Sequence, residues 1–164
     1  MFTLSARKSK WSFENVNDKN PGNSQGSTPL HQGAFSGNLE ICQYIINILD
    51  DKNPKNDAGI TPLHVAAEHG HLEICRIIIE NVDNKNPKMN YGTTPLHTAA
   101  EKGSFEIFQL ISENVKDKNP KDDHGTTPYH HAALRGYLDI CKCIIGHVGD
   151  ENPKDTFGRT PLHF

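Results

Sequence analysis

Two kinds of apolar cluster alternate along this chain, and each has the spacing of a helix. In the stretch 61–70, Leu63, Ala66 and Ala67 stand at positions i, i+3 and i+4, the spacing of one face of a short helix. In the following stretch, 71–79 (HLEICRIII), apolar residues are too dense for a surface helix with one narrow stripe. The pattern therefore predicts a short helix followed by a second helix that is buried on two sides.

Local signals for helix ends flank both clusters. Thr61 suits an N-cap, and Pro62 suits the first helical position, because the N–H that proline lacks would be unpaired there in any case. Gly70 is expected to end the first helix, since glycine readily turns left-handed after the last turn. Asn-Pro at 86–87 and Asn-Tyr-Gly-Thr at 90–93 are typical of turns, which predicts a hairpin-like connector.

The same organisation returns every 33 residues. TPLH begins at 28, 61, 94 and 160 and TPYH at 127, Asn-Pro begins at 20, 53, 86, 119 and 152, and glycine recurs at 26, 59, 92, 125 and 158. Three independent markers with one period do not arise by chance. We expect a degenerate or partial unit or cap at 1–27, four complete units at 28–60, 61–93, 94–126 and 127–159 (units 1 to 4), and the start of a further unit at 160–164.

Each unit is too small to bury its apolar face alone, so stability is expected from the interfaces between units. Alanine pairs at 66–67, 99–100 and 132–133 would let helices approach closely, and Gly33-Ala34 replaces the pair in unit 1. Ile140, Ile144 and Ile145 of the last complete unit are expected to be only partly covered.

The segments TPLHVAAEHGHLEIC (61–75) and TPLHTAAEKGSFEIF (94–108) resemble the TPLHxAAxxGHxxIV core of the ankyrin repeat family, which shares the 33-residue period. The resemblance covers residues 28–159. It implies an all-α repeat fold, an ankyrin-type solenoid of stacked helix-turn-helix units joined by hairpin-like loops. It also implies no chemistry of its own and a role in protein–protein recognition through the concave side, formed by hairpin tips and first helices.

One departure from the family pattern recurs after the second helix. The family's glycine position holds Leu49, Val82, Val115 and Val148, and its valine position holds Lys52, Lys85, Lys118 and Glu151. A β-branched residue does not readily adopt the left-handed conformation that glycine allows. We therefore expect the helix to end differently, with the leucine or valine turned inward.

The resemblance places the candidate partner-binding residues on the hairpin tips and the exposed end of each first helix, where the units also differ most from one another. With each hairpin counted here and below with the first helix that it leads into, they are Asp57, Ala58, Ile60, Glu68 and His69 in unit 2; Asn90, Tyr91, Thr93, Glu101 and Lys102 in unit 3; and Asp123, His124, Thr126, Leu134 and Arg135 in unit 4. Tyr91, Leu134 and Arg135 are the expected anchors, since aromatic residues and arginine are over-represented in binding hot spots. The alternative is an unconstrained surface.

The positions of histidine and cysteine favour structural roles over metal binding or catalysis. One histidine recurs at a single repeat position (His31, His64, His97, His130 and His163), where its equivalents form a ladder and do not converge as metal ligands must. His69, His71, His124, His131 and His147 are scattered and are expected at the surface or at a partner contact. Cys42, Cys75 and Cys141 share a position that Phe108 fills in unit 3, so packing is expected there, and the same is expected of Cys143. No metal, cofactor or catalytic residue is predicted.

Composition narrows the class of partner. Net charge is −3 with both signs interspersed, which disfavours nucleic acid, and no apolar run is long enough for a membrane span. Residues 1–11 lack the apolar core of a secretory signal, and four cysteines are too few for a disulfide scaffold, so an intracellular, cytoplasmic setting is the default expectation. Mean hydropathy is −0.62, low for a compact globule and compatible with an elongated, monomeric stack.

The expected function is a non-catalytic scaffold that binds a partner protein through the concave face. The alternative is a regulatory or targeting segment of a larger enzyme, channel or signalling protein, suggested by the chain ending one turn into a new unit. A further alternative, known for the family, is hydroxylation of Asn53, Asn86 and Asn119, although lysine precedes each in place of the usual valine. For the N-terminal segment, a cap with a polar outer face and a frayed tail both stay open, with Trp11 and Phe13 favouring docking.

Overall fold

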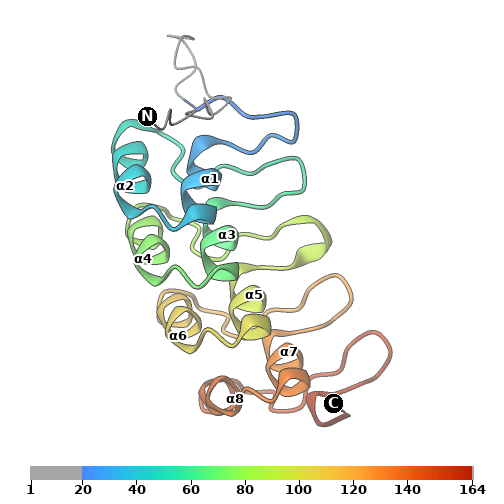
Figure 1. The fold of residues 1–164 in the computed structure, drawn as a ribbon. Coiled ribbons are helices and arrows are strands. Elements are labelled where there is room, and N and C mark those ends of the chain that lie inside the picture. Colours follow the sequence, from blue (N-terminus) through green and yellow to red (C-terminus); the bar gives the residue numbers. More distant parts are fainter. Residues whose placement is uncertain (1–19, 164) are drawn as a thin grey trace, which may run out of the picture.

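Helices stacked in two parallel columns make up the computed structural model, which describes residues 20–163 (Figure 1). The first helices of the units are α1 (Pro29–Ser36), α3 (Pro62–Glu68), α5 (Pro95–Lys102) and α7 (Pro128–Arg135). The second helices are α2 (Leu39–Ile48), α4 (Leu72–Glu80), α6 (Phe105–Glu113) and α8 (Leu138–Ile145). Two 3-10 helices, η1 (Asn90–Gly92) and η2 (Pro161–His163), complete the elements, and residues 20–163 contain no β-strand. The hairpin connectors project from the side of the first-helix column that faces away from the second helices (Figure 1).

Each first helix begins and ends as its sequence predicts. Thr61 is the N-cap of α3, and its backbone N–H donates to Nδ1 of His64 at 3.2 Å, which completes a reciprocal capping box. The same arrangement opens α1, α5 and α7. Gly70 follows α3 with a φ of 75°, a left-handed conformation that would strain a side chain with a Cβ.

Close approach of the first helices depends on small residues, as predicted. Ala66 and Ala67 of α3 are completely buried, as are Ala99 and Ala100 of α5, and α3 packs directly against α5. In unit 1 a Cβ added at Gly33 would lie 2.8 Å from Sγ of Cys42, so glycine is needed where α1 meets α2.

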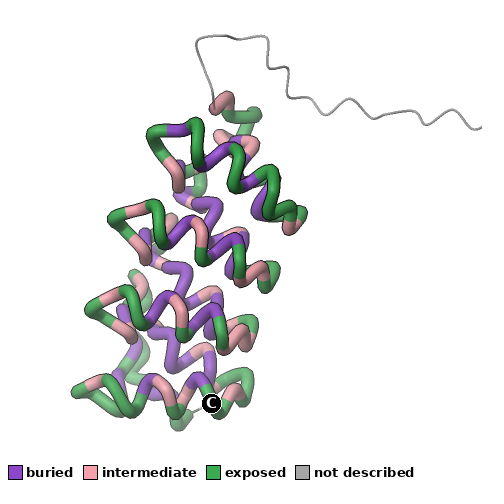
Figure 2. The backbone as a smooth tube through the Cα atoms, turned by 90° about the vertical axis from the view of Figure 1, so that its left-hand side faces the viewer, coloured by how far each residue is buried: buried purple, intermediate pink, exposed green. Residues whose placement is uncertain are grey.

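The two inner second helices, α4 and α6, are covered on both sides, which confirms for them the prediction from apolar density, whereas α2 and α8 each have one second-helix neighbour among the described residues. Helices α2, α4, α6 and α8 pack in a row, and their buried residues line the inside of the stack (Figure 2). The expectation for the last unit was wrong in two of three residues, because Ile140 and Ile144 are buried. Ile140 and Ile144 are covered by the preceding unit or by the first helix of their own unit, so of the three isoleucines only Ile145 faces the open end.

The recurring departure from the family pattern changes how the second helix ends, as expected. Leu49 caps α2 in extended backbone (φ −98°) with its side chain buried. Val82, Val115 and Val148 are partly buried against the core, and none has a positive φ. The carbonyl of Ile77 near the end of α4 accepts a hydrogen bond from Nδ2 of Asn81 at 2.8 Å, so a side chain stabilises the end that glycine usually forms.

The proposed cap at 1–27 is described only from residue 20, and Trp11 and Phe13 lie outside the described residues. Among residues 20–163, no helix combines the length and apolar character needed to cross a bilayer.

Candidate protein-binding surface

Short polar side chains hold the hairpin tips in shape. In unit 2, Oδ1 of Asn56 accepts the backbone N–H groups of Ala58 at 3.0 Å and Ile60 at 2.9 Å. The carboxylate of Asp122 does the same in the tip that carries His124 and Thr126. Such side-chain-to-backbone bonds fix a turn locally, so the exposed residues of these tips have a defined orientation before any partner arrives.

Hydrogen bonds between units join the tips into a row. The N–H of Asn90 donates to the carbonyl of Ala58 at 3.0 Å, and the N–H of Asp123 donates to the carbonyl of Tyr91, also at 3.0 Å. Beside the tips, a lysine Nζ donates to the carbonyl of the lysine 33 residues later, from Lys55 to Lys88 at 2.7 Å and from Lys88 to Lys121 at 3.3 Å. The tips therefore form a continuous surface along the stack.

The tip of unit 3 differs because Met89 replaces the Asn or Asp that stabilises the other tips. A thioether cannot accept the two backbone N–H groups as a carboxamide or carboxylate does. The backbone instead forms η1, and Tyr91 adopts a φ of 66°, the only positive φ of a non-glycine residue in the described chain. Its side chain is 74% exposed. A strained backbone that presents an exposed aromatic ring is a reason to suspect function.

Ion pairs cross from unit to unit at the ends of the first helices. Nζ of Lys102 lies 3.2 Å from Oε1 of Glu68, and Nη2 of Arg135 lies 3.2 Å from Oε1 of Glu101. These pairs are largely solvent-exposed, so each contributes little to stability. They do hold the expected anchor Arg135 next to a carboxylate of the neighbouring unit, an arrangement that the sequence did not reveal.

All fifteen candidate residues lie at the surface. Ile60, Thr93, Glu101 and Thr126 are half-buried, and the other eleven, Asp57, Ala58, Glu68, His69, Asn90, Tyr91, Lys102, Asp123, His124, Leu134 and Arg135, are exposed. They fall into two rows, the tip row on the hairpins and the helix-end row at the ends of the first helices, and the hairpins project from the first-helix column (Figure 1).

Two exposed aromatic residues of this surface were missed by the sequence analysis. Phe157, 78% exposed, occupies the Tyr91 position two units later, and the guanidinium of Arg159 lies 5.1 Å from the centre of its ring. Phe35 occupies the Leu134 position in unit 1, and its ring centre lies 4.6 Å from that of His69. The repeat period locates both residues, but the candidates were drawn from units 2 to 4 alone.

The recurring histidine links neighbouring units. Nδ1 of His97 accepts the backbone N–H of Thr94 at 3.2 Å, so the ring proton is on Nε2, which donates to the carbonyl of Thr126 in the next unit at 3.1 Å. Burial lowers the pKa of His97 to about 4 and that of His64 to about 4. Both rings are therefore neutral at pH 7 and use both nitrogens for structure.

No group of three or more His, Cys, Asp or Glu residues within 20–163 is arranged to hold a metal ion. His131, one of the scattered histidines expected at the surface or at a partner contact, is half-buried, and its ring lies edge-on to that of His97 with centres 5.9 Å apart.

The four cysteines are free thiols. Burial raises the pKa of Cys42 to about 11 and that of Cys75 to about 12, which keeps both thiols protonated. A protonated, buried thiol is a weak nucleophile, so these residues act in packing.

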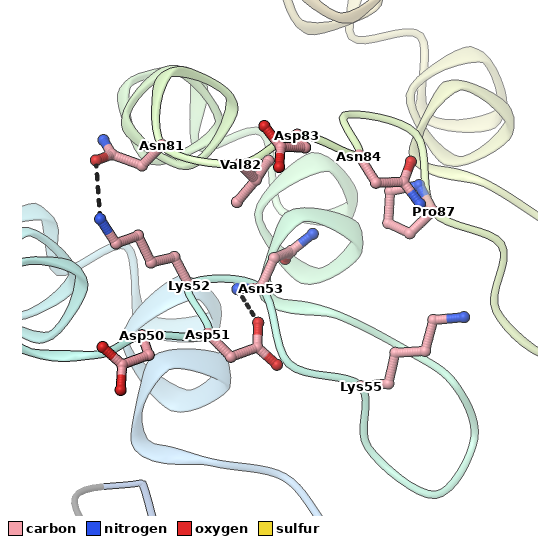
Figure 3. A pocket seen from close by; sticks show the side chains of 10 residues that line it. All are labelled: Asp50, Asp51, Lys52, Asn53, Lys55, Asn81, Val82, Asp83, Asn84 and Pro87. Carbon is pink, nitrogen blue, oxygen red and sulfur yellow. Dashed lines mark hydrogen bonds between the residues drawn. The ribbon is translucent and has the colours of Figure 1, made fainter.

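A groove of about 310 Å³ lies between the connectors of units 1 and 2, lined by ten residues that include Asp51, Lys52 and Asn53 (Figure 3). Similar grooves lie between later connectors, which indicates that they result from stacking. The Oδ1 atom of Asn53 accepts the backbone N–H of Leu63 at 3.0 Å, and Asn86 and Asn119 make equivalent bonds. Hydroxylation of these asparagines would have to proceed from side chains that are already engaged.

Paired helices stacked in one direction, with hairpins that bond to their neighbours, define a helical repeat solenoid. A family model described as ankyrin repeats (3 copies) matches residues 45–122, and a single ankyrin repeat model matches residues 25–57 and 124–156. The chain belongs to the ankyrin repeat family, whose members generally mediate protein–protein interaction and are typically non-catalytic. No curated protein matches the chain.

Proposed function

We propose that this chain is a non-catalytic scaffold that binds a partner protein through the tip row and the helix-end row. The observation that carries the proposal is Tyr91, an aromatic residue that is 74% exposed on left-handed backbone at the middle of the tip row. A strained, exposed aromatic residue makes no contribution to stacking that would explain it, whereas aromatic residues are frequent anchors of interfaces.

Variation between units supports the same surface. At the tip position of Tyr91 the other units hold Ala58, His124 and Phe157, whereas threonine, proline and histidine at the helix start hardly change. Residues needed for stacking must repeat, and residues that contact a partner need not, because a partner has no 33-residue period.

We also propose an intracellular compartment for this scaffold. Four free thiols, two of them deeply buried, support a reducing, intracellular setting for the scaffold.

A double variant, Tyr91→Ala with Arg135→Ala, tests the surface. Affinity capture from extract of the native cell first identifies the partner, and titration of the purified partner then gives the Kd of each variant. We expect the double variant to weaken binding at least about tenfold, or about 1.4 kcal/mol, with a nearly unchanged melting temperature.

The matched control substitutes Glu80 and Lys142, both exposed on second helices, with alanine. Binding should survive these changes. Loss of binding in the control together with full binding in the double variant would move the site to the opposite side of the stack.

A further inference from the structure

The hairpin tip at residues 155–159 holds a cation over an aromatic ring. The guanidinium carbon of Arg159 lies 5.1 Å from the centre of the Phe157 ring. Nε of the same arginine donates to Oδ2 of the buried Asp155 at 2.7 Å. An aromatic face attracts a cation, and a charge-assisted hydrogen bond to a carboxylate fixes the position of that cation. This tip therefore contains a guanidinium site made of one ring and one carboxylate.

The tip of unit 3 has an aromatic ring at the same place without the arginine. Tyr91 and Thr93 occupy the positions of Phe157 and Arg159, two periods earlier in the chain. In the part of the chain that the structure describes, no cation lies over the Tyr91 ring, and threonine cannot supply one. Because Tyr91 is also 74% exposed, its ring is open to a cation from another molecule.

A carboxylate of the next unit lies beside Tyr91. The backbone N–H of Asp123 donates to the carbonyl of Tyr91 at 3.0 Å. The side chain of Asp123 lies over Gly92, because a Cβ added at that glycine would be 2.6 Å from Oδ1 of Asp123. Gly92 directly follows Tyr91, so the ring and the carboxylate occupy the same place in the tip row.

This juxtaposition occurs once among the described tips. The other pairs joined by the same backbone hydrogen bond are Gln25 with Asp57, Ala58 with Asn90, and His124 with Thr156. None of these three pairs places a carboxylate beside an aromatic ring. The combination of ring and carboxylate is therefore particular to the tips of units 3 and 4 and is not a consequence of the repeat.

The carboxylate of Asp123 is also free to bind a cation. Two glutamates of the helix-end row, Glu68 and Glu101, form ion pairs with basic residues of the next unit. The carboxylates of Asp57 and Asp123 form neither an ion pair nor a side-chain hydrogen bond with any residue from 20 to 163. The tip row therefore has negative charge that the chain itself does not neutralise, and a cationic group of a partner would complement it.

We propose that Tyr91 and Asp123 bind an arginine side chain of the partner protein, an inference that rests on the scaffold function proposed above. Arginine suits the site better than lysine, because its planar guanidinium packs on an aromatic ring and presents several N–H donors to one carboxylate. Arg159 contacts a ring and a carboxylate of its own tip in this way. The partner segment that lies along the tip row is thus basic at the place where it meets unit 3.

Selection from a random peptide library tests the inference without knowledge of the natural partner. Peptides recovered on the purified wild-type chain should be enriched in arginine. The enrichment should disappear on Asp123→Asn, which removes the charge, and on Tyr91→Asn, which removes the ring and tolerates left-handed backbone. Asp83→Asn is the matched control, because it removes an exposed carboxylate that follows α4, and the enrichment should persist there.

Affinity of one selected peptide measures the contact directly. Replacing its arginine by citrulline keeps the shape and removes the charge. This change should weaken binding to the wild type about tenfold or more and binding to Asp123→Asn less than about twofold, because the charged partner is already gone there. Isothermal titration calorimetry gives the Kd values, and thermal melts verify that each variant is folded.

Several outcomes would overturn the arginine site. They are equal arginine enrichment on wild type and Asp123→Asn, enrichment of lysine in place of arginine, and a selection that recovers no peptide. Failure of the scaffold function would look different, because natural partner binding would then survive Tyr91→Ala with Arg135→Ala. Partner binding that is lost in that double variant but unchanged in Asp123→Asn would contradict the arginine site alone.

Discussion

Histidine at the start of each first helix is both an acceptor at Nδ1 and a donor at Nε2, and only the neutral ring can be both. A proton added to Nδ1 of His64 would oppose the N–H of Thr61, and a buried charge would be poorly solvated. The stability of the helix starts is thus coupled to pH through the pKa of these rings.

Stability should fall as the pH is lowered from about 6.5 towards about 4. Burial lowers the pKa of His64 and His97 to about 4 from 6.5, so between these values the unfolded state binds protons that the folded state does not. The stabilisation is complete above pH 6.5, and its loss approaches something on the order of 3 kcal/mol per ring at pH 4. Urea unfolding across this pH range measures it, and His97→Asn should make the dependence shallower. An equally steep curve in the variant would contradict this account.

Stability also depends on the alanine residues at the contacts between first helices. Ala99→Leu should lower the free energy of unfolding by about 1–3 kcal/mol or more, because a completely buried site between α5 and its neighbours has no room for three additional carbons. Glu101→Ala on the same helix removes one exposed ion pair and should cost less than about 0.5 kcal/mol. Thermal melts compare the two, and equal losses would show that the buried face of α5 has been misassigned.

Among the elements, the hairpin of unit 3 departs from its neighbours because of one residue. Met89→Asp should let the side chain accept the N–H groups of Tyr91 and Thr93, as Asp122 does for His124 and Thr126. Tyr91 would then leave the left-handed region, which relieves strain on the order of 1 kcal/mol. A higher melting temperature is the expected result, with Met89→Ala, which supplies no acceptor, as the control. An unchanged or lower melting temperature would show that the strain is absent or compensated.

Helices could be predicted from the sequence because their signals are local. Thr61, Pro62 and Gly70 each act within one turn of the helix that they begin or end, and the period repeats these signals four times. Contacts across units were less accessible to prediction. The ion pair of Arg135 with Glu101 depends on how far α7 is displaced from α5. The backbone conformation of Tyr91 depends on the absence of a side-chain acceptor at Met89 for the backbone N–H groups of the tip.

Burial at the last unit was misjudged for a related reason. Ile140 was expected to lose cover along with Ile145, although the two positions face opposite neighbours. Periodicity gives the apolar positions of a helix, but the assignment of each position to the preceding or following unit needs the stacking direction.

In the whole molecule, stability is distributed between neighbours, so the ends should be the least protected parts. Unit 4 has no following second helix among the described residues, and we expect its amide hydrogens to exchange fastest of the four units. Exchange measured by mass spectrometry resolves the units. Equally fast exchange in units 2 and 3 would contradict a stack held by nearest-neighbour contacts.

The bonds between units also determine which changes of length the chain tolerates. Lysine side chains reach carbonyls 33 residues later, and histidine rings reach carbonyls 29 residues later, at every step where both partners are present. Deleting or duplicating one whole period restores every such bond with the same chemical partner. A single residue inserted within a connector displaces the carbonyl partners that follow it, so the bonds that cross that connector lose their register. The fold therefore tolerates changes of chain length when they are whole multiples of the repeat period. An array of this kind can gain or lose repeats through recombination between its own repeats, because the interface between units stays the same.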